Sequence, residues 1–95
     1  LLGLVFFVYR LRIKFLEFKI KNEFEMNKIL TKNEISKRER EIIELLLKGN
    51  NSKEIEDKLF ISPHTIKNHI YNIYKKLGVK NRGELILLLR VNKNL

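Results

Sequence analysis

The chain has 95 residues, of which 20 are basic and 11 acidic, and it carries a formal net charge of +9 and no cysteine. This length supports one small domain, and the lack of cysteine excludes a disulfide framework, a thiolate metal site and a thiol nucleophile. The positive charge indicates a negatively charged partner, such as nucleic acid or an anionic membrane surface.

The chain opens with an uninterrupted run of apolar and small residues over 1–9, followed by three bases, Arg10, Arg12 and Lys14. A spanning helix needs about 20 apolar residues, so this run alone cannot cross a bilayer. Because the bases follow the run and Tyr9 suits the interface, we interpret residues 1–9 as the end of a truncated transmembrane helix. The edge of an upstream soluble core would give the same pattern. A signal peptide is disfavoured, since its positive charge precedes its apolar region.

Residues 10–34 form a basic amphipathic linker with a mixed pattern. A helical stripe is formed by Ile13, Leu16, Ile20 and Phe24, whereas residues 16–21 alternate as a strand would, and we predict a helix. The stripe ends after Phe24 and does not support a sustained coiled coil. A short parallel pairing of two linkers, contact with an anionic membrane surface and a solvated connector all fit the pattern.

A compact domain is predicted over residues 35–95, and its first helix begins after Ser36. The run Ser36-Lys37-Arg38-Glu39 has the form of a capping box, in which Ser36 accepts from a free amide and Glu39 reaches back. Gly49 suits the left-handed position that ends a helix, so this helix should run to about Lys48.

Further capping signals predict three more helices. The second is short and follows turn and capping residues, Asn50, Asn51 and Ser52. The fourth begins where Asn81 and Glu84 can form another capping pair, ahead of the apolar run 85–89. The turns are too tight for a sheet. The predicted fold is therefore all-α, a four-helix bundle that contains a helix-turn-helix and follows a helical linker.

The third helix, predicted over residues 63–77, has Ser62 as its N-cap, Pro63 at its first position and no acidic residue. At about 100° per residue, its apolar stripe consists of Ile66, Ile70, Ile73 and Leu77. The opposite side carries Lys67, Asn68, Tyr71, Asn72 and Lys75. One face therefore suits a core, and the other offers hydrogen-bond donors and cations to a polyanion.

Two helices joined by a short turn, the second basic on its outer face, form a helix-turn-helix that places its second helix in the major groove of double-stranded DNA. Lys67 can donate to guanine, Asn68 can pair with adenine, and Tyr71 can offer its hydroxyl or its ring edge to thymine. Phosphate can be held by free amides and charge at the starts of the second and fourth helices, through Ser52, Lys53 and Arg82.

The residues of these helices resemble the LuxR-type DNA-binding domain from residue 35 to about residue 89. The resemblance is carried by Ile35-Ser36-Lys37-Arg38-Glu39, Gly49, Lys53-Glu54-Ile55, Leu59, Ile61-Ser62, Thr65-Ile66-Lys67, His69, Ile73, Lys76-Leu77 and Asn81-Arg82. Region 4 of sigma factors shares the opening and the turn, but it lacks the tail and the final helix that residues 76–89 provide here.

The resemblance implies a transcription-regulating domain that binds DNA as a dimer, attached to a part that senses a signal and, in some members, to a membrane. It implies base contacts at Lys67, Asn68 and Tyr71, and it implies phosphate contacts at three further residues, Thr65, Lys75 and Lys76. Glu56 departs from the family, where a small alanine is common. Its carboxylate must therefore tilt outward or find a basic partner, and it would repel phosphate.

The last helix predicts a dimer interface. Leu85, Leu88 and Leu89 form one stripe, whereas three apolar residues lie off it, Ile86, Leu87 and Val91. One small core cannot cover all of them, so a symmetric partner is expected to pack there. An upstream domain or a membrane would cover the same face.

No catalytic residue, metal site or cofactor is predicted. His64 and His69 lie on different sides of the third helix, without a cysteine or a paired carboxylate beside them. The predicted partners are double-stranded DNA, a second copy of the chain and the transcription machinery. The predicted location is the cytoplasm, at the inner face of the cell membrane. The alternative function is a membrane-tethered basic module that binds an acidic protein without DNA sequence specificity.

Overall fold

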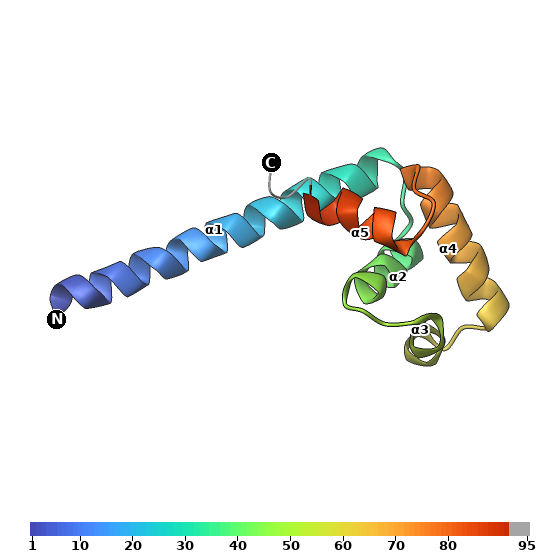
Figure 1. Cartoon of the computed structure of the whole chain (residues 1–95), viewed down its shortest axis with the longest axis horizontal. Helices are drawn as coiled ribbons and strands as arrows, with labels where there is room; N and C mark the ends of the chain where they lie inside the picture. The colour runs from blue at the N-terminus through green and yellow to red at the C-terminus, as the bar shows by residue number, and fades with distance from the viewer. Residues whose placement is uncertain (92–95) are drawn as a thin grey trace.

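A computed structural model describes residues 1–91 of the chain, apart from the side chain of Val91. Over these residues the chain forms five helices and no strand (Figure 1). The helices are α1 (Leu2–Lys32), α2 (Lys37–Leu47), α3 (Ser52–Leu59), α4 (Pro63–Leu77) and α5 (Arg82–Val91). The predicted all-α class, with a helical linker before a bundle of four short helices, is confirmed.

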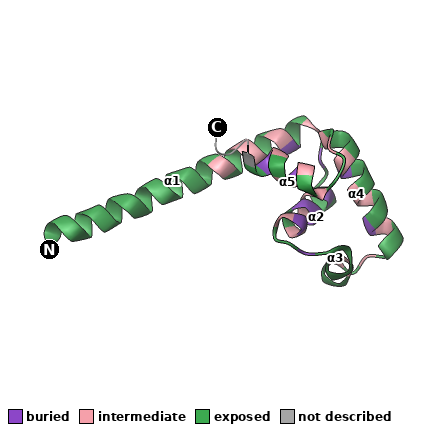
Figure 2. Ribbon diagram, viewed as in Figure 1, coloured by how far each residue is buried: buried purple, intermediate pink, exposed green. Residues whose placement is uncertain are grey.

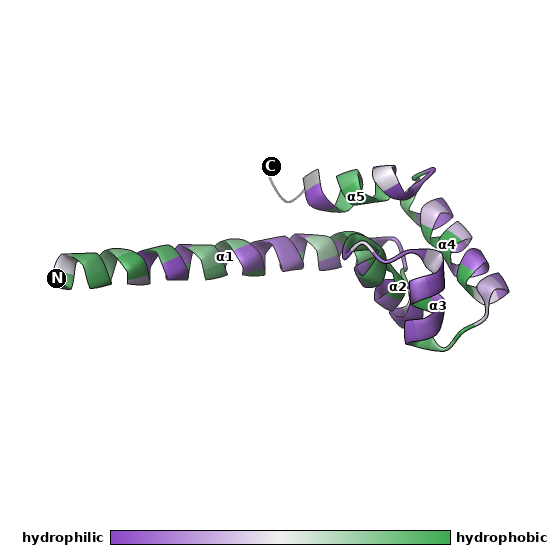
Figure 3. Ribbon diagram, turned by 60° about the horizontal axis from the view of Figure 1, so that its bottom comes forward, coloured by the Kyte–Doolittle hydropathy of each residue, from purple (hydrophilic) through white to green (hydrophobic). Residues whose placement is uncertain are grey.

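Helix α1 is a single helix of 31 residues that projects from the bundle and gives the molecule a length of 58 Å (Figure 1). It covers both the apolar run at residues 1–9 and the linker. Only its last turns pack against the core, where Leu30 is 2% exposed and Met26 and Ile29 are partly buried. The rest of α1 is exposed (Figure 2), and its first turns are largely hydrophobic (Figure 3). No helix within residues 1–91 combines the length and the apolar character needed to cross a membrane.

Local side-chain caps set the starts of the four short helices, α2 to α5. In α2 the Glu39 amide donates to Ser36 Oγ at 3.1 Å, and the Ser36 amide donates to Glu39 Oε1 at 2.8 Å, which confirms the predicted capping box. A second capping box joins Asn51 and Glu54 at the start of α3. The predicted pair before α5 is also present, since the Glu84 amide donates to Asn81 Oδ1 at 2.9 Å.

The core lies between α2, α3, α4 and α5 and includes the end of α1 (Figure 2). Its buried apolar residues are Leu30, Ile35, Ile42, Ile43, Leu46, Ile55, Ile66, Ile73, Leu85 and Leu89. The stripe predicted for α4 faces this core, with Ile66 and Ile73 buried and Ile70 and Leu77 partly buried. Burying a side chain of this size contributes about 1.5–3 kcal/mol, so the stripe fixes which face of α4 remains outside.

The last carbonyls of α2 are bound by arginines from α5. Arg82 donates to the carbonyl oxygen of Leu46 at 2.6 Å, and Arg90 donates to that of Leu47 at 2.6 Å. Arg82 also donates to the carbonyl oxygen of Asn50, in the turn after α2, at 2.9 Å. A helix end leaves such carbonyls without partners inside the helix, and cations there also complement the helix dipole. These bonds tie α5 to the end of α2.

A single arginine joins α1 to α2. Arg40 donates through Nη1 to Asn27 Oδ1 at 3.0 Å and through Nη2 to Thr31 Oγ1 at 2.9 Å. Because Asn27 and Thr31 are one turn apart on α1, the planar guanidinium engages both at once. Together with the burial of Leu30, this contact fixes the direction in which α1 leaves the domain.

Candidate nucleic-acid interface

Helices α3 and α4 form the predicted helix-turn-helix, and the turn between them is tight. The chain reverses at Phe60, which has left-handed backbone angles (φ 55°, ψ 44°), and the amide of Ile61 donates to the carbonyl of Glu56 at 3.3 Å. Ser62 then caps α4, with Pro63 in its first turn as predicted. The Phe60 side chain is 92% exposed, so no packing offsets the cost of its backbone conformation.

The outer face of α4 brings together the residues predicted to contact bases. Lys67, Asn68 and Tyr71 are all exposed, on the side of the helix away from the buried Ile66 and Ile73. Lys75 continues the same exposed face one turn further along. Helix α4 contains no acidic residue, so its outer face carries no negative charge beside these side chains.

The beginning of α4 orders two polar side chains. Ser62 Oγ accepts from the Thr65 amide at 3.1 Å and lies 2.8 Å from Thr65 Oγ1, which places the half-buried Thr65 within the cap. One turn along, Asn68 Nδ2 lies 3.2 Å from His64 Nε2. No contact was predicted for His64, although its spacing of four residues from Asn68 places both side chains on one face of the helix.

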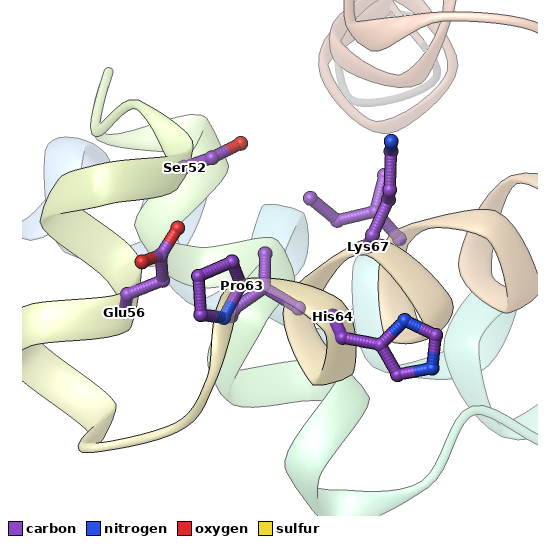
Figure 4. Close-up of a pocket in the computed structure, with 7 residues that line it drawn as sticks. Ser52, Glu56, Pro63, His64 and Lys67 are labelled. Atoms are coloured by element: carbon purple, nitrogen blue, oxygen red, sulfur yellow. The ribbon is translucent and has the colours of Figure 1, made fainter.

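A shallow groove of about 510 Å³ runs between α3 and α4 (Figure 4). Its lining residues are Ser52, Glu56, Pro63, His64, Ile66, Lys67 and Ile70. In Figure 4 the carboxylate of Glu56 stands beside the Pro63 ring and points to the same side as Ser52 Oγ. Glu56 is half-buried and forms no ion pair within the described part of the chain. Of the two predicted arrangements, the structure therefore favours the outward tilt, and it places an acid in the groove that Lys67 also lines.

Lys76 turns toward the inside of the domain. Its ammonium donates to Glu39 Oε1 at 2.7 Å and to the carbonyl of Glu34 at 3.1 Å. Glu39 is only 3% exposed. Burial alone would raise the pKa of Glu39, but the hydrogen bonds from Lys76 and from the Ser36 amide outweigh it and hold the pKa below its usual value. Glu39 is therefore ionised at neutral pH and links the start of α2 to α4.

The other residues predicted to contact phosphate lie in different surroundings. Ser52 and Lys53 are exposed in the first turn of α3, where Lys53 makes a solvated ion pair with Asp57 at 3.6 Å. Arg82 instead directs its guanidinium at the carbonyls of α2, away from the outer face of α4. Its charge partly offsets the effect of burial on Tyr74, whose pKa is raised. The structure thus brings Ser52, but not Arg82, to the groove beside Lys67.

Helix α5 leaves part of its apolar surface uncovered. Leu85 and Leu89 are fully buried and Ile86 is half-buried, whereas Leu87 is 61% exposed. The side chain of Val91, the third residue predicted at a dimer interface, lies outside the described residues. Leu87 is thus an apolar residue on the outer side of a helix whose opposite face is anchored in the core.

Comparison with known proteins places the domain. A model of the luxR family of bacterial regulatory proteins matches residues 33–89. The spore germination protein GerE of Bacillus subtilis (strain 168) is 46% identical over 72 residues, which cover 75% of this chain and 90% of GerE. No solved structure matches the chain.

Two longer proteins match over a shorter part of the chain. The CsgBAC operon transcriptional regulatory protein of Escherichia coli (strain K12) is 44% identical over 52 residues, or 55% of this chain. The oxygen regulatory protein NreC of Staphylococcus aureus (strain JH9) is 48% identical over the same number of residues. In both cases the match spans 24% of the longer protein.

Proposed function

Since the chain belongs to the luxR family of bacterial regulatory proteins, it is a sequence-specific DNA-binding regulator of transcription, and we propose that α4 reads base edges in the major groove. The observation that carries the proposal is the outer face of α4, where Lys67, Asn68 and Tyr71 are exposed together on a helix without an acidic residue. Each of these side chains can donate to a base edge, and the buried stripe on the opposite face holds them outward.

The DNA backbone is proposed to lie along the groove and the ends of α4. A hydroxyl and two cations lie exposed beside the reading face, which is the outer face of α4; they belong to Ser52, Lys53 and Lys75. Thr65 joins them at the capped start of α4, where its hydroxyl already orients toward Ser62. Lys76 and Arg82 donate to acceptors of the protein itself in this fold, so we propose a positioning role for them, in which Lys76 joins α4 to α2 and Arg82 joins α5 to the end of α2.

The test is a measurement of binding to a site selected from random sequences, at fixed salt, with base-pair substitutions at each position. Lys67→Ala and Asn68→Ala should each cost about 1–3 kcal/mol at particular base pairs. Lys75→Ala should weaken all sequences alike and reduce the salt slope by about 1. An acidic-protein adaptor would show no preference for one site over random duplex. Unchanged site preference in both Lys67→Ala and Asn68→Ala would remove these residues from the reading face.

We further propose that the regulator binds DNA as a dimer through α5, with Leu87, Ile86 and Val91 at the contact. The exposed Leu87 supports this, because a symmetric partner would cover it and present two reading helices to half-sites about 34–36 Å apart. Leu87→Asp should convert two-to-one protein–DNA complexes to one-to-one complexes at equal protein concentration. Lys48→Asp, an exposed change outside α5, is the control for added charge. A two-to-one complex that survives Leu87→Asp would place the interface elsewhere.

We also propose that residues 1–9 attach the chain to a membrane, so that the DNA-binding domain works on its cytoplasmic face. In this segment the apolar side chains point to all sides of α1 and are 48% exposed or more, and three bases follow directly. The full chain should sediment with vesicles rich in anionic lipid, and Phe7→Asp with Val8→Asp should reduce that binding without affecting DNA binding. Absence of binding to anionic vesicles would refute the attachment.

A further inference from the structure

Helix α1 carries a narrow apolar stripe that its own domain leaves uncovered. Tyr9, Ile13, Leu16 and Ile20 follow one another at spacings of four, three and four residues and are 61%, 37%, 51% and 65% exposed. The residues of α1 that pack in the core, Met26, Ile29 and Leu30, come after the stripe in the chain, so all four residues of the stripe stay clear of the domain. We infer that this stripe pairs in parallel with the same stripe of a second copy, as a short two-stranded coiled coil.

The residue types in the stripe favour two parallel strands. In a heptad frame Ile13 and Ile20 occupy the a positions, and Leu16 occupies the d position between them. Branched isoleucine at a with leucine at d is the combination that favours a parallel pair. Asn27 falls at the next a position, but its side chain is bound by Arg40, so the pairing ends where α1 meets the domain.

Charge complementarity favours a second copy of the chain as the partner that covers this stripe. Arg12 lies at a g position and Glu17 at the e position of the following heptad, so in a parallel pair each Arg12 faces the partner's Glu17. Within the described chain neither residue has an ion-pair partner. A parallel pair of α1 helices would therefore gain two symmetric ion pairs between the helices, from side chains that form no ion pair within the described part of one chain.

Charge also excludes the second apolar stripe of α1 from self-pairing. That stripe, formed by Leu4, Val8, Leu11, Phe15 and Phe18, is exposed as well. Over residues 12–21, the e and g positions beside this second stripe hold only bases, namely Arg12, Lys14, Lys19 and Lys21. Two copies joined there would place like charges opposite one another, which is unfavourable.

The stripe covers fewer than the three or four heptads over which a coiled coil is normally sustained, so it does not hold a dimer by itself. The inference therefore rests on the proposed dimer, in which α5 and DNA raise the effective concentration of one α1 beside the other. Since Arg40 and Leu30 fix α1 to the domain, the pairing would in turn set how the two reading helices are oriented.

Disulfide trapping tests the geometry directly, because the chain has no cysteine of its own. Ile20→Cys in the full chain, bound to a selected DNA site, should form a disulfide-linked dimer under mild oxidation. Phe18→Cys, on the other stripe, is the matched control and should react at least about tenfold more slowly, because f positions face away from the partner. Equal or faster trapping at Phe18→Cys would overturn the inference. Loss of the two-to-one complex with DNA itself would instead count against the proposed dimer.

A charge exchange tests the pairing partners. Arg12→Glu or Glu17→Arg alone should slow trapping at Ile20→Cys by about tenfold, since two attractive pairs become repulsive. The double variant Arg12→Glu with Glu17→Arg should restore the parent rate, because the opposite charges face each other again. Single variants that trap as fast as the parent, or a double variant that is not restored, would contradict the parallel register.

Discussion

Replacement of Lys76 by methionine separates an internal role from contact with DNA. The change removes the ammonium that donates to Glu39 Oε1 at 2.7 Å and keeps most of the aliphatic stem. Glu39 is 3% exposed and would keep its charge with only the capping contacts of Ser36. Removing one partner of a buried pair costs about 3–5 kcal/mol. Because the Lys76 side chain is 37% exposed, water screens part of the pair, and we expect a loss of about 2 kcal/mol.

The assay is urea unfolding of the full chain at neutral pH, with the helical signal in circular dichroism as the readout and Lys75→Met as the control. In thermal unfolding, a loss of this size lowers the melting temperature by about 10 °C for a domain of this length. The DNA salt slope should be unchanged in Lys76→Met and reduced by about 1 in Lys75→Met. If Lys76→Met instead keeps full stability and reduces the salt slope, Lys76 contacts phosphate and the internal role is wrong.

The same pair predicts how stability depends on pH. The pKa of Glu39 is lower in the folded chain than in the unfolded chain, so its contribution is complete above the unfolded value. The contribution is lost as pH falls through the folded pKa. The stability difference between the parent and Lys76→Met should therefore shrink in acid. A difference that stays constant from neutral pH to pH values below the folded pKa would contradict this assignment.

Three further changes test other features. Arg82→Ala removes two charge-assisted bonds to the end of α2 and should cost about 2 kcal/mol in urea unfolding, with Arg82→Lys in between; an unchanged midpoint would refute the anchoring role. Phe60→Gly should stabilise the domain by up to about 1 kcal/mol, because the site is left-handed and its side chain is 92% exposed; a lower midpoint would show that Phe60 makes a stabilising contact. Glu56→Ala should raise affinity for all DNA sequences alike, since it removes an acid from the groove; a gain confined to one site would give Glu56 a reading role.

Helix boundaries and faces were predictable from the sequence because their causes are local. Ser36 and Asn81 each find a glutamate three residues later, and Gly78 supplies the left-handed residue that closes α4. The stripe that buries Ile66 and Ile73 likewise follows from helical periodicity. These signals need no knowledge of the rest of the chain, and they suffice to orient the reading face.

The acceptor that each basic side chain binds could not be predicted from the local sequence. The local pattern predicts that both Lys76 and Arg82 contact the DNA backbone, and it gives no sign that in the fold they also donate to Glu39 and to the carbonyl of Leu46. Those acceptors lie 37 and 36 residues away in the chain. A base on a helix has the same local pattern whether it faces water or a neighbouring helix end, so tertiary packing decides. Asn50 is predicted as a turn residue, but its burial and its acceptance of a hydrogen bond from Lys58 at 2.7 Å have no local signal.

The caps of the domain also bear on how it folds. Ser36, Asn51, Ser62 and Asn81 each accept from an amide only three residues ahead, so each helix can begin before any distant segment has arrived. Proteins dominated by such short-range contacts fold in microseconds to milliseconds, because little loop-closure entropy is lost before the first contacts form. A domain emerging from the ribosome behind α1 would therefore complete its reading helix soon after its last residues become available, before slower steps such as pairing with a second copy begin.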